Sequence, residues 1–275
     1  MKRLIITLAT AVSISLMIVS CSDDATSPGM DNPPQLPTNF TPAQVDISFF
    51  QQNEMPATEN HDTYNRTKAT AIKGNSVLGT GGFAEIGASF IFFAQLLGVE
   101  PEIDGNSWVW TIRFSEDMFG PGFGKLESFA AASEEFIIRI VATPSSNSVG
   151  WQIFFTGQFE DGVINDALIL SGETSNNSDS GTWNVHSPEH GGAVVLSYSW
   201  QKESESSLSL TTNGKDPDSG DEFTVNYEKD GTEHFMIFTE PGNSVSLYWN
   251  SSTNSGWIDE NGQRSCFTNF EESAC

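Results

Sequence analysis

Four carboxylates are gathered within seven residues in the segment Asp216-Pro217-Asp218-Ser219-Gly220-Asp221-Glu222. Calcium prefers clustered oxygen ligands on flexible loops, so Asp216, Asp218, Asp221 and Glu222 form a candidate calcium loop. The order of an EF-hand is not met, because glycine stands at the fifth position and no helix pattern flanks the segment. A solvated hairpin loop is the simpler interpretation of the same residues. No other cofactor is indicated.

A second group with the potential for chemistry is His186-Ser187-Pro188-Glu189-His190. It has the H-x-x-E-H order of inverted zinc peptidases, in which both histidines must lie on one face of a helix. Here Pro188 stands between the histidines, two glycines follow, and the flanking segments have strand periodicity. These features predict a turn that contains two histidines, and we expect no catalytic zinc site.

Other catalytic patterns are missing from the sequence. There is no Gly-x-Ser-x-Gly elbow and no phosphate-binding loop. A glycosidase needs two carboxylates facing each other across a cleft, but with 36 acidic residues almost any pair could be nominated. The sequence therefore assigns no catalytic residue, and a hydrolase remains only as an alternative.

The first cysteine stands at the end of an N-terminal apolar segment. Lys2 and Arg3 precede the uncharged run from Leu4 to Val19, which is followed by Ser20 and Cys21. A charged start, a short apolar core and a small residue before the break are typical of a secretory signal peptide. The run is about 15 residues, whereas a bilayer-spanning helix needs about 20. A permanent transmembrane helix is therefore the less favoured interpretation.

The ending Ile18-Val19-Ser20-Cys21 resembles the lipobox of bacterial lipoproteins, although Ile is less usual than Leu at its first position. The resemblance covers residues 1–24 and implies that residues 1–20 are removed and that Cys21 carries the lipid. Three acyl chains on one residue would anchor the protein durably to a membrane. Ser22 looks like the outer-membrane default of diderm bacteria, and Asp23-Asp24 resembles acidic surface-export signals. The implied location is the outer membrane, on its periplasmic or cell-surface side.

Cys266 and Cys275 are the two cysteines that remain after lipidation. In an oxidising compartment an even pair predicts a disulfide. It would close a loop of about ten residues and stabilise the protein by ~2–3 kcal/mol. We expect this disulfide to hold the C-terminal tail on the last strand.

The chain of 275 residues has 12 basic and 36 acidic residues, a net charge of −24. Such a chain does not bind nucleic acid through phosphates and is not attracted to anionic headgroups. Its membrane partner is therefore expected to be reached through the N-terminal lipid alone.

Beyond the signal peptide, residues 21–39 are rich in Pro, Ser, Asp and Asn and predict a disordered tether. Residues 40–275 are expected to form a single β-rich domain with a helical N-terminal part at about 42–100. A short helix is predicted over about 42–51, with Thr41 as its cap. Apolar residues at three- and four-residue spacing predict one apolar helix over 83–97, while residues 61–78 are polar and ambiguous.

From Trp108 onward, apolar and polar residues alternate. Short runs of this kind, separated by turns such as Asp230-Gly231 and Asn261-Gly262, predict an antiparallel meander of about 10–12 strands. A meander of this length must curl or close, because flat open sheets leave reactive edges. The predicted fold is mainly β, a curved antiparallel sheet or barrel with one apolar helix on its N-terminal side.

Taken together, these features predict a lipid-anchored cell-envelope lipoprotein with a non-catalytic binding or scaffold role. Aromatic residues are abundant, with seven Trp and 20 Phe, and most are expected to fill the interior of the sheet. A carrier of an apolar ligand or lipid within the curled sheet is one alternative. A hydrolase of extracellular polymer is the other.

Overall fold

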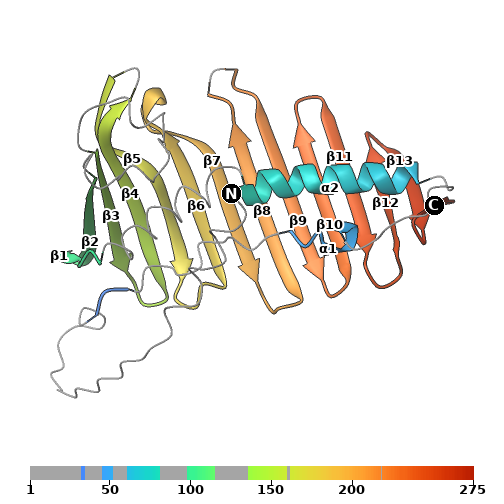
Figure 1. Cartoon of the computed structure of the whole chain (residues 1–275), viewed down its shortest axis with the longest axis horizontal. Coiled ribbons are helices and arrows are strands. Elements are labelled where there is room, and N and C mark those ends of the chain that lie inside the picture. The colour runs from blue at the N-terminus through green and yellow to red at the C-terminus, as the bar shows by residue number, and fades with distance from the viewer. Residues whose placement is uncertain are drawn as a thin grey trace, which may run out of the picture.

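The protein is built on one antiparallel sheet of 14 strands, in which every strand pairs with its neighbours in the chain. The computed structural model describes residues 32–34, 45–51, 61–80, 98–114, 136–159, 162–217 and 219–275. Figure 1 shows the strands side by side in chain order, with a long helix lying across the later ones. The strands are β1 (Glu102–Asp104), β2 (Ser107–Phe114), β3 (Phe136–Pro144), β4 (Ser148–Phe159), β5 (Gly162–Ser175), β6 (Ser180–Ser187), β7 (Ala193–Lys202), β8 (Ser207–Lys215), β9 (Glu222–Asp230), β10 (Glu233–Glu240), β11 (Asn243–Asn250), β12 (Ser255–Glu260), β13 (Gln263–Thr268) and β14 (Glu271–Ser273).

The predicted antiparallel meander is confirmed, with more strands than expected and without closure into a barrel. Each alternating run of the sequence lies within one strand, because period-two alternation places every second side chain on the same face. The connections are tight turns. Asn261 and Gly262 both have positive φ, 54° and 87°, which is the conformation that two-residue hairpin turns require.

One face of the sheet, which we call the inner face, carries the core. Residues directly opposite one another on paired strands share a face, so the register places the buried side chains of all the central strands together. They include Trp110, Ile140, Ile153, Leu210, Met236 and Leu247, each no more than 3% exposed. The opposite face, which we call the outer face, is largely polar.

Glycines on the inner face make room for aromatic rings on the neighbouring strand. Gly256 lies directly opposite Phe267, and a Cβ built on Gly256 would come within 2.6 Å of the Phe267 ring. The same pairing recurs between other strands, so aromatic rings lie over the backbone instead of leaving gaps. The further pairs are Gly172–Trp183, Gly181–Trp200 and Gly214–Phe223.

Helix α2 (Asp62–Thr80) covers the inner face in the C-terminal part of the sheet. It crosses the strands from β14 to β8, as Figure 1 shows. At its start, His61 Nδ1 lies 2.8 Å from the carbonyl oxygen of Phe270, and Thr63 donates to Glu272. Farther along, Gly74 lets the helix approach the sheet closely, because a Cβ there would overlap the side chain of Met236.

Helix α1 (Ser48–Gln51) packs beside α2 on the same face. Phe50 is fully buried, with its ring centroid 5.2 Å from that of Trp249, and Tyr64 of α2 lies between Phe267 and Phe270. These rings fill the space between the helices and the sheet. The helices therefore complete the core of strands β8–β14.

The helical predictions fared less well than the strands. Residues 45–47 are not helical, so the predicted helix over 42–51 reduces to α1 among the described residues. Its cap is Asp46, whose carboxylate accepts a hydrogen bond from the Ser48 backbone N–H at 3.1 Å; the predicted cap, Thr41, lies outside the described residues. The predicted apolar helix over 83–97 also lies outside them.

The two edges of the sheet are short and acidic. Strand β1 has three exposed residues, Glu102, Ile103 and Asp104, and β14 carries Glu271 and Glu272. Short charged edge strands discourage pairing with another sheet. The sheet can therefore stay open, which is the first of the two forms, curved sheet or barrel, that the sequence predicted.

Candidate functional site

The outer face presents rows of small polar side chains across the middle of the sheet. Directly opposite residues on paired strands lie about 5 Å apart, so each row is a line of neighbouring groups. We name three rows by their position along the strands. The end row is Ser180, Gln201, Ser209, Glu228, Phe235 and Tyr248; the middle row is Glu173, Thr182, Ser199, Thr211 and Asn226; the far row is Ser171, Asn184, Ser197, Asn213, Thr224, Thr239 and Ser244.

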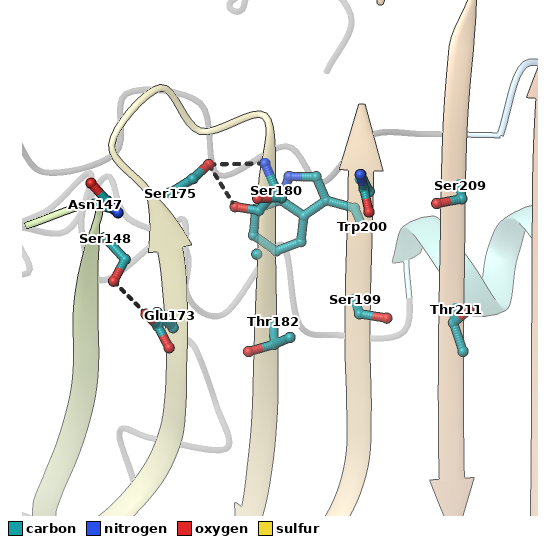
Figure 2. Close-up of a pocket in the computed structure, with 12 residues that line it drawn as sticks. Asn147, Ser148, Glu173, Ser175, Ser180, Thr182, Ser199, Trp200, Ser209 and Thr211 are labelled. Carbon is teal, nitrogen blue, oxygen red and sulfur yellow. Dashed lines mark hydrogen bonds between the residues drawn. The ribbon is translucent and has the colours of Figure 1, made fainter. Parts of the chain in front are cut away.

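The end row and, apart from Asn226, the middle row line two hollows in the outer face. The first, of about 400 Å³, lies over β4–β8 and is shown in Figure 2. The second, of about 540 Å³, lies over β7–β11 and is bounded by the β7–β8 turn. Gln201 and Ser209 line both, so the two hollows adjoin and form one polar groove.

Hydroxyl and amide groups dominate the first hollow. Figure 2 shows Thr182, Ser199 and Thr211 from three adjacent strands, with Glu173 and Ser148 joined by a hydrogen bond. Thr211 Oγ1 donates to Asn226 Oδ1 at 2.9 Å. The Trp200 ring packs over Gly181 on the inner face and donates through Nε1 to the carbonyl oxygen of Ser178 at 3.2 Å.

The second hollow is more acidic and carries two aromatic rings. Glu203, Glu228, Asp230 and Glu233 contribute carboxylates, and the rings of Phe235 and Tyr248 are half-buried. The Tyr248 hydroxyl donates to Glu233 Oε1 at 3.1 Å. Burial raises the pKa of this hydroxyl, so it stays a hydrogen-bond donor at neutral pH.

Next to Tyr248 on the outer face, the ring of Trp257 lies between two other side chains. The Trp257 ring lies 6.1 Å from that of Tyr248, nearly parallel to it, and the Arg264 guanidinium sits 3.9 Å from the centroid of Trp257. Tyr248 and Arg264 come from the strands on either side of β12. Trp257 is thus engaged by the protein on both sides and offers no open ring face to a ligand.

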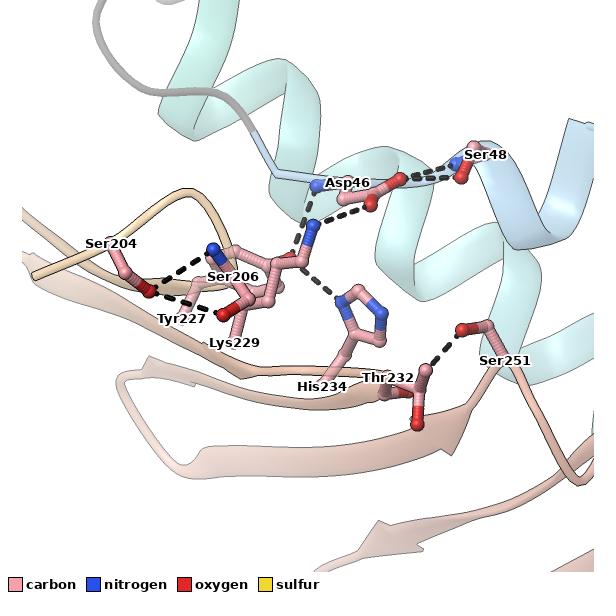
Figure 3. A network of polar contacts seen from close by, with 9 residues as sticks. All are labelled: Asp46, Ser48, Ser204, Ser206, Tyr227, Lys229, Thr232, His234 and Ser251. Carbon is pink, nitrogen blue, oxygen red and sulfur yellow. Dashed lines mark hydrogen bonds and ion pairs between the residues drawn. The ribbon is translucent and has the colours of Figure 1, made fainter. Parts of the chain in front are cut away.

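Several titratable groups with clear pKa shifts form a network beneath α1, and two members of this network, Lys229 and His234, also line the second hollow (Figure 3). Lys229 Nζ donates to Asp46 at 2.9 Å, and the Asp46 N–H donates to the Tyr227 hydroxyl at 3.1 Å. That hydroxyl lies 2.9 Å from Nδ1 of His234, whose ring stacks on Trp249 with centroids 4.8 Å apart. The network joins the segment before α1 to strands β9 and β10.

The pKa shifts of this network have simple physical causes. Burial raises the pKa of Asp46, but hydrogen bonds from Ser48 and Lys229 outweigh it and lower the pKa to about 2. Burial lowers the pKa of His234 to about 4 and raises that of the Tyr227 hydroxyl. At neutral pH, His234 and Tyr227 are therefore uncharged and the one charge pair is Asp46–Lys229. This is the chemistry of a structural anchor.

The H-x-x-E-H segment forms the predicted turn only in part, because the turn contains His190 but not His186. His186 is on β6, with Nε2 2.8 Å from Ser171 Oγ, whereas residues Pro188–His190 form one turn of 3₁₀-helix. His190 Nδ1 lies 2.8 Å from Ser187 Oγ. Among the residues that the structure describes, no group of three or more His, Cys, Asp or Glu side chains could hold a metal ion.

The candidate calcium loop connects β8 to β9. The Asp216 carboxylate accepts the Ser219 N–H at 3.1 Å, and Glu222 pairs with Lys215 at 2.9 Å. Asp218 lies outside the described residues, and Asp221 takes part through its backbone. The described residues of this loop thus make a hairpin connection in which the Asp216 carboxylate bonds within the turn and Glu222 pairs with Lys215.

The three cysteines fall in different parts of the chain. Cys266 and Cys275 form a disulfide with their Cα atoms 5.2 Å apart, joining β13 to the end of the chain. Cys21, the predicted lipidation site, lies outside the described residues.

The outer-face rows were not predicted from the sequence. The signal that could have found them is the choice of polar residue between the core positions of β6–β9. These positions hold Thr182, Asn184, Ser197, Ser199 and Thr211 where an ordinary solvated face would hold Lys and Glu. Small neutral polar groups on several adjacent strands indicate a face adapted to something other than solubility.

None of the helices within the described ranges is long and apolar enough to cross a membrane. No family model, no curated protein and no solved structure matches the chain.

Proposed function

We propose that the protein is a lipoprotein of the bacterial outer membrane, anchored through Cys21, whose sheet acts as a non-catalytic binding module. The anchor rests on the sequence of residues 1–24. The binding role rests on one observation, the two adjoining hollows on the outer face. A module of this kind would face either the periplasm or the cell exterior.

The hydrogen bonding of the groups with shifted pKa values supports binding over catalysis. Catalytic acids and bases usually show perturbed pKa values within a cleft. Here His234 also lines the second hollow, but it is neutral at pH 7, stacked on Trp249 and hydrogen-bonded to Tyr227 within the network beneath α1. The carboxylates of Glu173 and Glu233, by contrast, accept hydrogen bonds from neutral hydroxyls in the hollows.

The carrier alternative needs an apolar chamber on the inner face. Under α1 and α2 that space is filled by aromatic rings, among them Phe50, Tyr64 and Trp249. The chamber that the sequence suggested, between residues 83–97 and the sheet, lies outside the described residues. The polar groove is therefore the feature that favours one function over the others.

Metabolic labelling with radioactive palmitate tests the anchor. The full chain is expressed in a diderm bacterium as wild type, as Cys21→Ala and as the neighbouring control Ser22→Ala. We expect wild type and Ser22→Ala to incorporate the label and Cys21→Ala to lose it, because only the thiol of Cys21 can accept the diacylglyceryl group. Equal labelling of Cys21→Ala and wild type contradicts the lipoprotein proposal.

A further inference from the structure

The end row of the outer face forms a continuous floor through both hollows. Its six residues, from Ser180 on β6 to Tyr248 on β11, lie directly opposite one another on successive strands. Five inter-strand steps of ~4.8 Å give a floor of about 24 Å. This length suits an extended chain molecule that crosses the strands, and it exceeds what a single small molecule needs.

Several hydroxyls on this floor and in the middle row beside it are open. Among the residues that the structure describes, the side-chain hydroxyls of Thr182, Ser199 and Ser209 have no hydrogen-bond partner. Gln201 lines both hollows, is exposed and contributes a side-chain amide. The groove thus offers hydroxyls that both donate and accept, together with amide donors.

The charges of the groove select against anionic ligands. Five of its lining residues are acidic, and Lys229, the one cationic residue among them, is already paired with Asp46 at 2.9 Å. The whole chain carries a net charge of −24. Two of the carboxylates, Glu173 and Glu233, accept hydrogen bonds from hydroxyls, which are the groups a neutral polyol supplies in number.

Aromatic rings lie at one end of the groove. Phe235 and Tyr248 line the second hollow, and both rings are half-buried. The exposed parts of such rings favour the C–H surfaces of a sugar ring, and the Tyr248 hydroxyl keeps its hydrogen bond to Glu233. Alternating polar and apolar contacts of this kind match a carbohydrate chain.

From these observations we infer that the groove binds a neutral polysaccharide, laid across strands β6–β11. The inference names the ligand class for the binding role proposed above and rests on that role. A basic peptide is the competing occupant, because of the carboxylates at the β7–β8 and β9–β10 turns. The two occupants are separated by experiment.

The test is affinity electrophoresis of the full lipidated protein in detergent micelles. The gels contain neutral β-glucan, galactomannan or xylan, with alginate as the anionic comparison, and polylysine binding is measured separately. The hollow variant is Thr182→Val with Thr211→Val. The matched control is Thr239→Val with Thr224→Val in the far row, since Thr224 also donates to an asparagine, Asn213, and Thr239 is also exposed.

We expect at least one neutral polysaccharide to retard the wild type and alginate to leave it unaffected. The hollow variant should bind about tenfold more weakly or worse, because two hydroxyl partners are lost, and the control should stay within about twofold. Thr→Val keeps the β-branched shape, and circular dichroism checks that both variants fold. Gln201→Leu is a second, exposed hollow variant with the same expected loss.

Three results overturn the inference: no retardation by any of the neutral polysaccharides, equal losses in hollow and control variants, or polylysine binding that the hollow variant abolishes. Palmitate labelling is read independently. Labelling without polysaccharide binding removes the ligand class and leaves the anchor standing. Binding without labelling does the reverse.

Discussion

The two faces of the sheet are made by the same strands and follow opposite rules. On the inner face, side chains are large and apolar, glycines are placed under rings, and polar groups such as His234 and Tyr227 are bonded to one another. On the outer face, many side chains of β6–β9 are small and polar, carboxylates line the groove, and hydroxyls of the hollows stay open. The difference teaches that the inner face holds the fold together, while the outer face can change at little cost in stability.

The largest expected difference between the two faces comes from truncating one tryptophan on each of them. Trp249 is fully buried among Phe50, Tyr227 and His234, so Trp249→Ala should lower the free energy of unfolding by ~3–5 kcal/mol. Trp257 lies on the outer face between Tyr248 and Arg264, and Trp257→Ala should cost no more than ~1.5 kcal/mol. Urea titration measures both. Equal losses would mean that the faces are not energetically distinct.

A matched pair of glycines gives the next largest effect. In Gly256→Ala the new methyl group overlaps the Phe267 ring, and we expect a loss of ~1–3 kcal/mol. Gly150 lies on the outer face, where the nearest atom to an added Cβ is 3.7 Å away. Gly150→Ala should therefore be neutral or stabilise by up to ~1 kcal/mol, because alanine loses less backbone entropy than glycine on folding. Thermal unfolding of the two variants decides this, and a stabilised Gly256→Ala contradicts the proposed packing.

The smallest effect is a pH dependence that belongs to the inner face. The pKa of His234 falls from 6.5 to about 4 on folding, so the unfolded chain takes up a proton first as the pH falls. Its contribution to stability is full above pH 6.5 and is lost as the pH falls toward 4, by roughly 0.5–1 kcal/mol between pH 7 and pH 6. His234→Phe should remove this part of the slope and keep the stacking on Trp249. Urea titrations of wild type and variant at both pH values measure it, and identical slopes would show that His234 does not titrate as its burial requires.

Strands were predictable because their signal is local. The alternation in Trp108–Phe114 or Phe223–Tyr227 requires only that one face be buried, and turn pairs such as Asn261-Gly262 mark where each hairpin reverses. The three-residue edge strands β1 and β14 are too short to show a period, which accounts for part of the undercount. Whether the sheet closes into a barrel depends on whether its two edge strands pair with each other. No local sequence pattern indicates such a pairing.

Helix α2 was missed for a different reason. Its buried stripe is made by Tyr64, Thr67, Ala71, Gly74 and Leu78, at helical spacing. Two of these five carry no apolar signal. Thr67 satisfies its hydroxyl on the carbonyl oxygen of Thr63 at 2.8 Å, and Gly74 is needed for the approach to Met236. Both choices become intelligible only once the sheet beneath the helix is known.

The candidate site was hidden for a related reason. Thr182, Ser199 and Thr211 are unremarkable within their own strands, and the groove exists only because the register places them in line. Residues that looked chemical in the sequence, such as His186 and Asp216, serve turns and hairpins instead. Spacing along a chain finds sites built on one segment, whereas this site is built across six strands.

The pairing of each strand only with its neighbours in the chain also bears on how the protein can change length. Because no later strand is inserted between two earlier ones, one hairpin could be gained or lost without rearranging the pairs on either side of it. A groove that crosses the strands would then lengthen or shorten in steps of two strands. The length of the groove could therefore evolve by duplication of a short stretch of coding sequence, while the ligand contacts made by each strand stay the same.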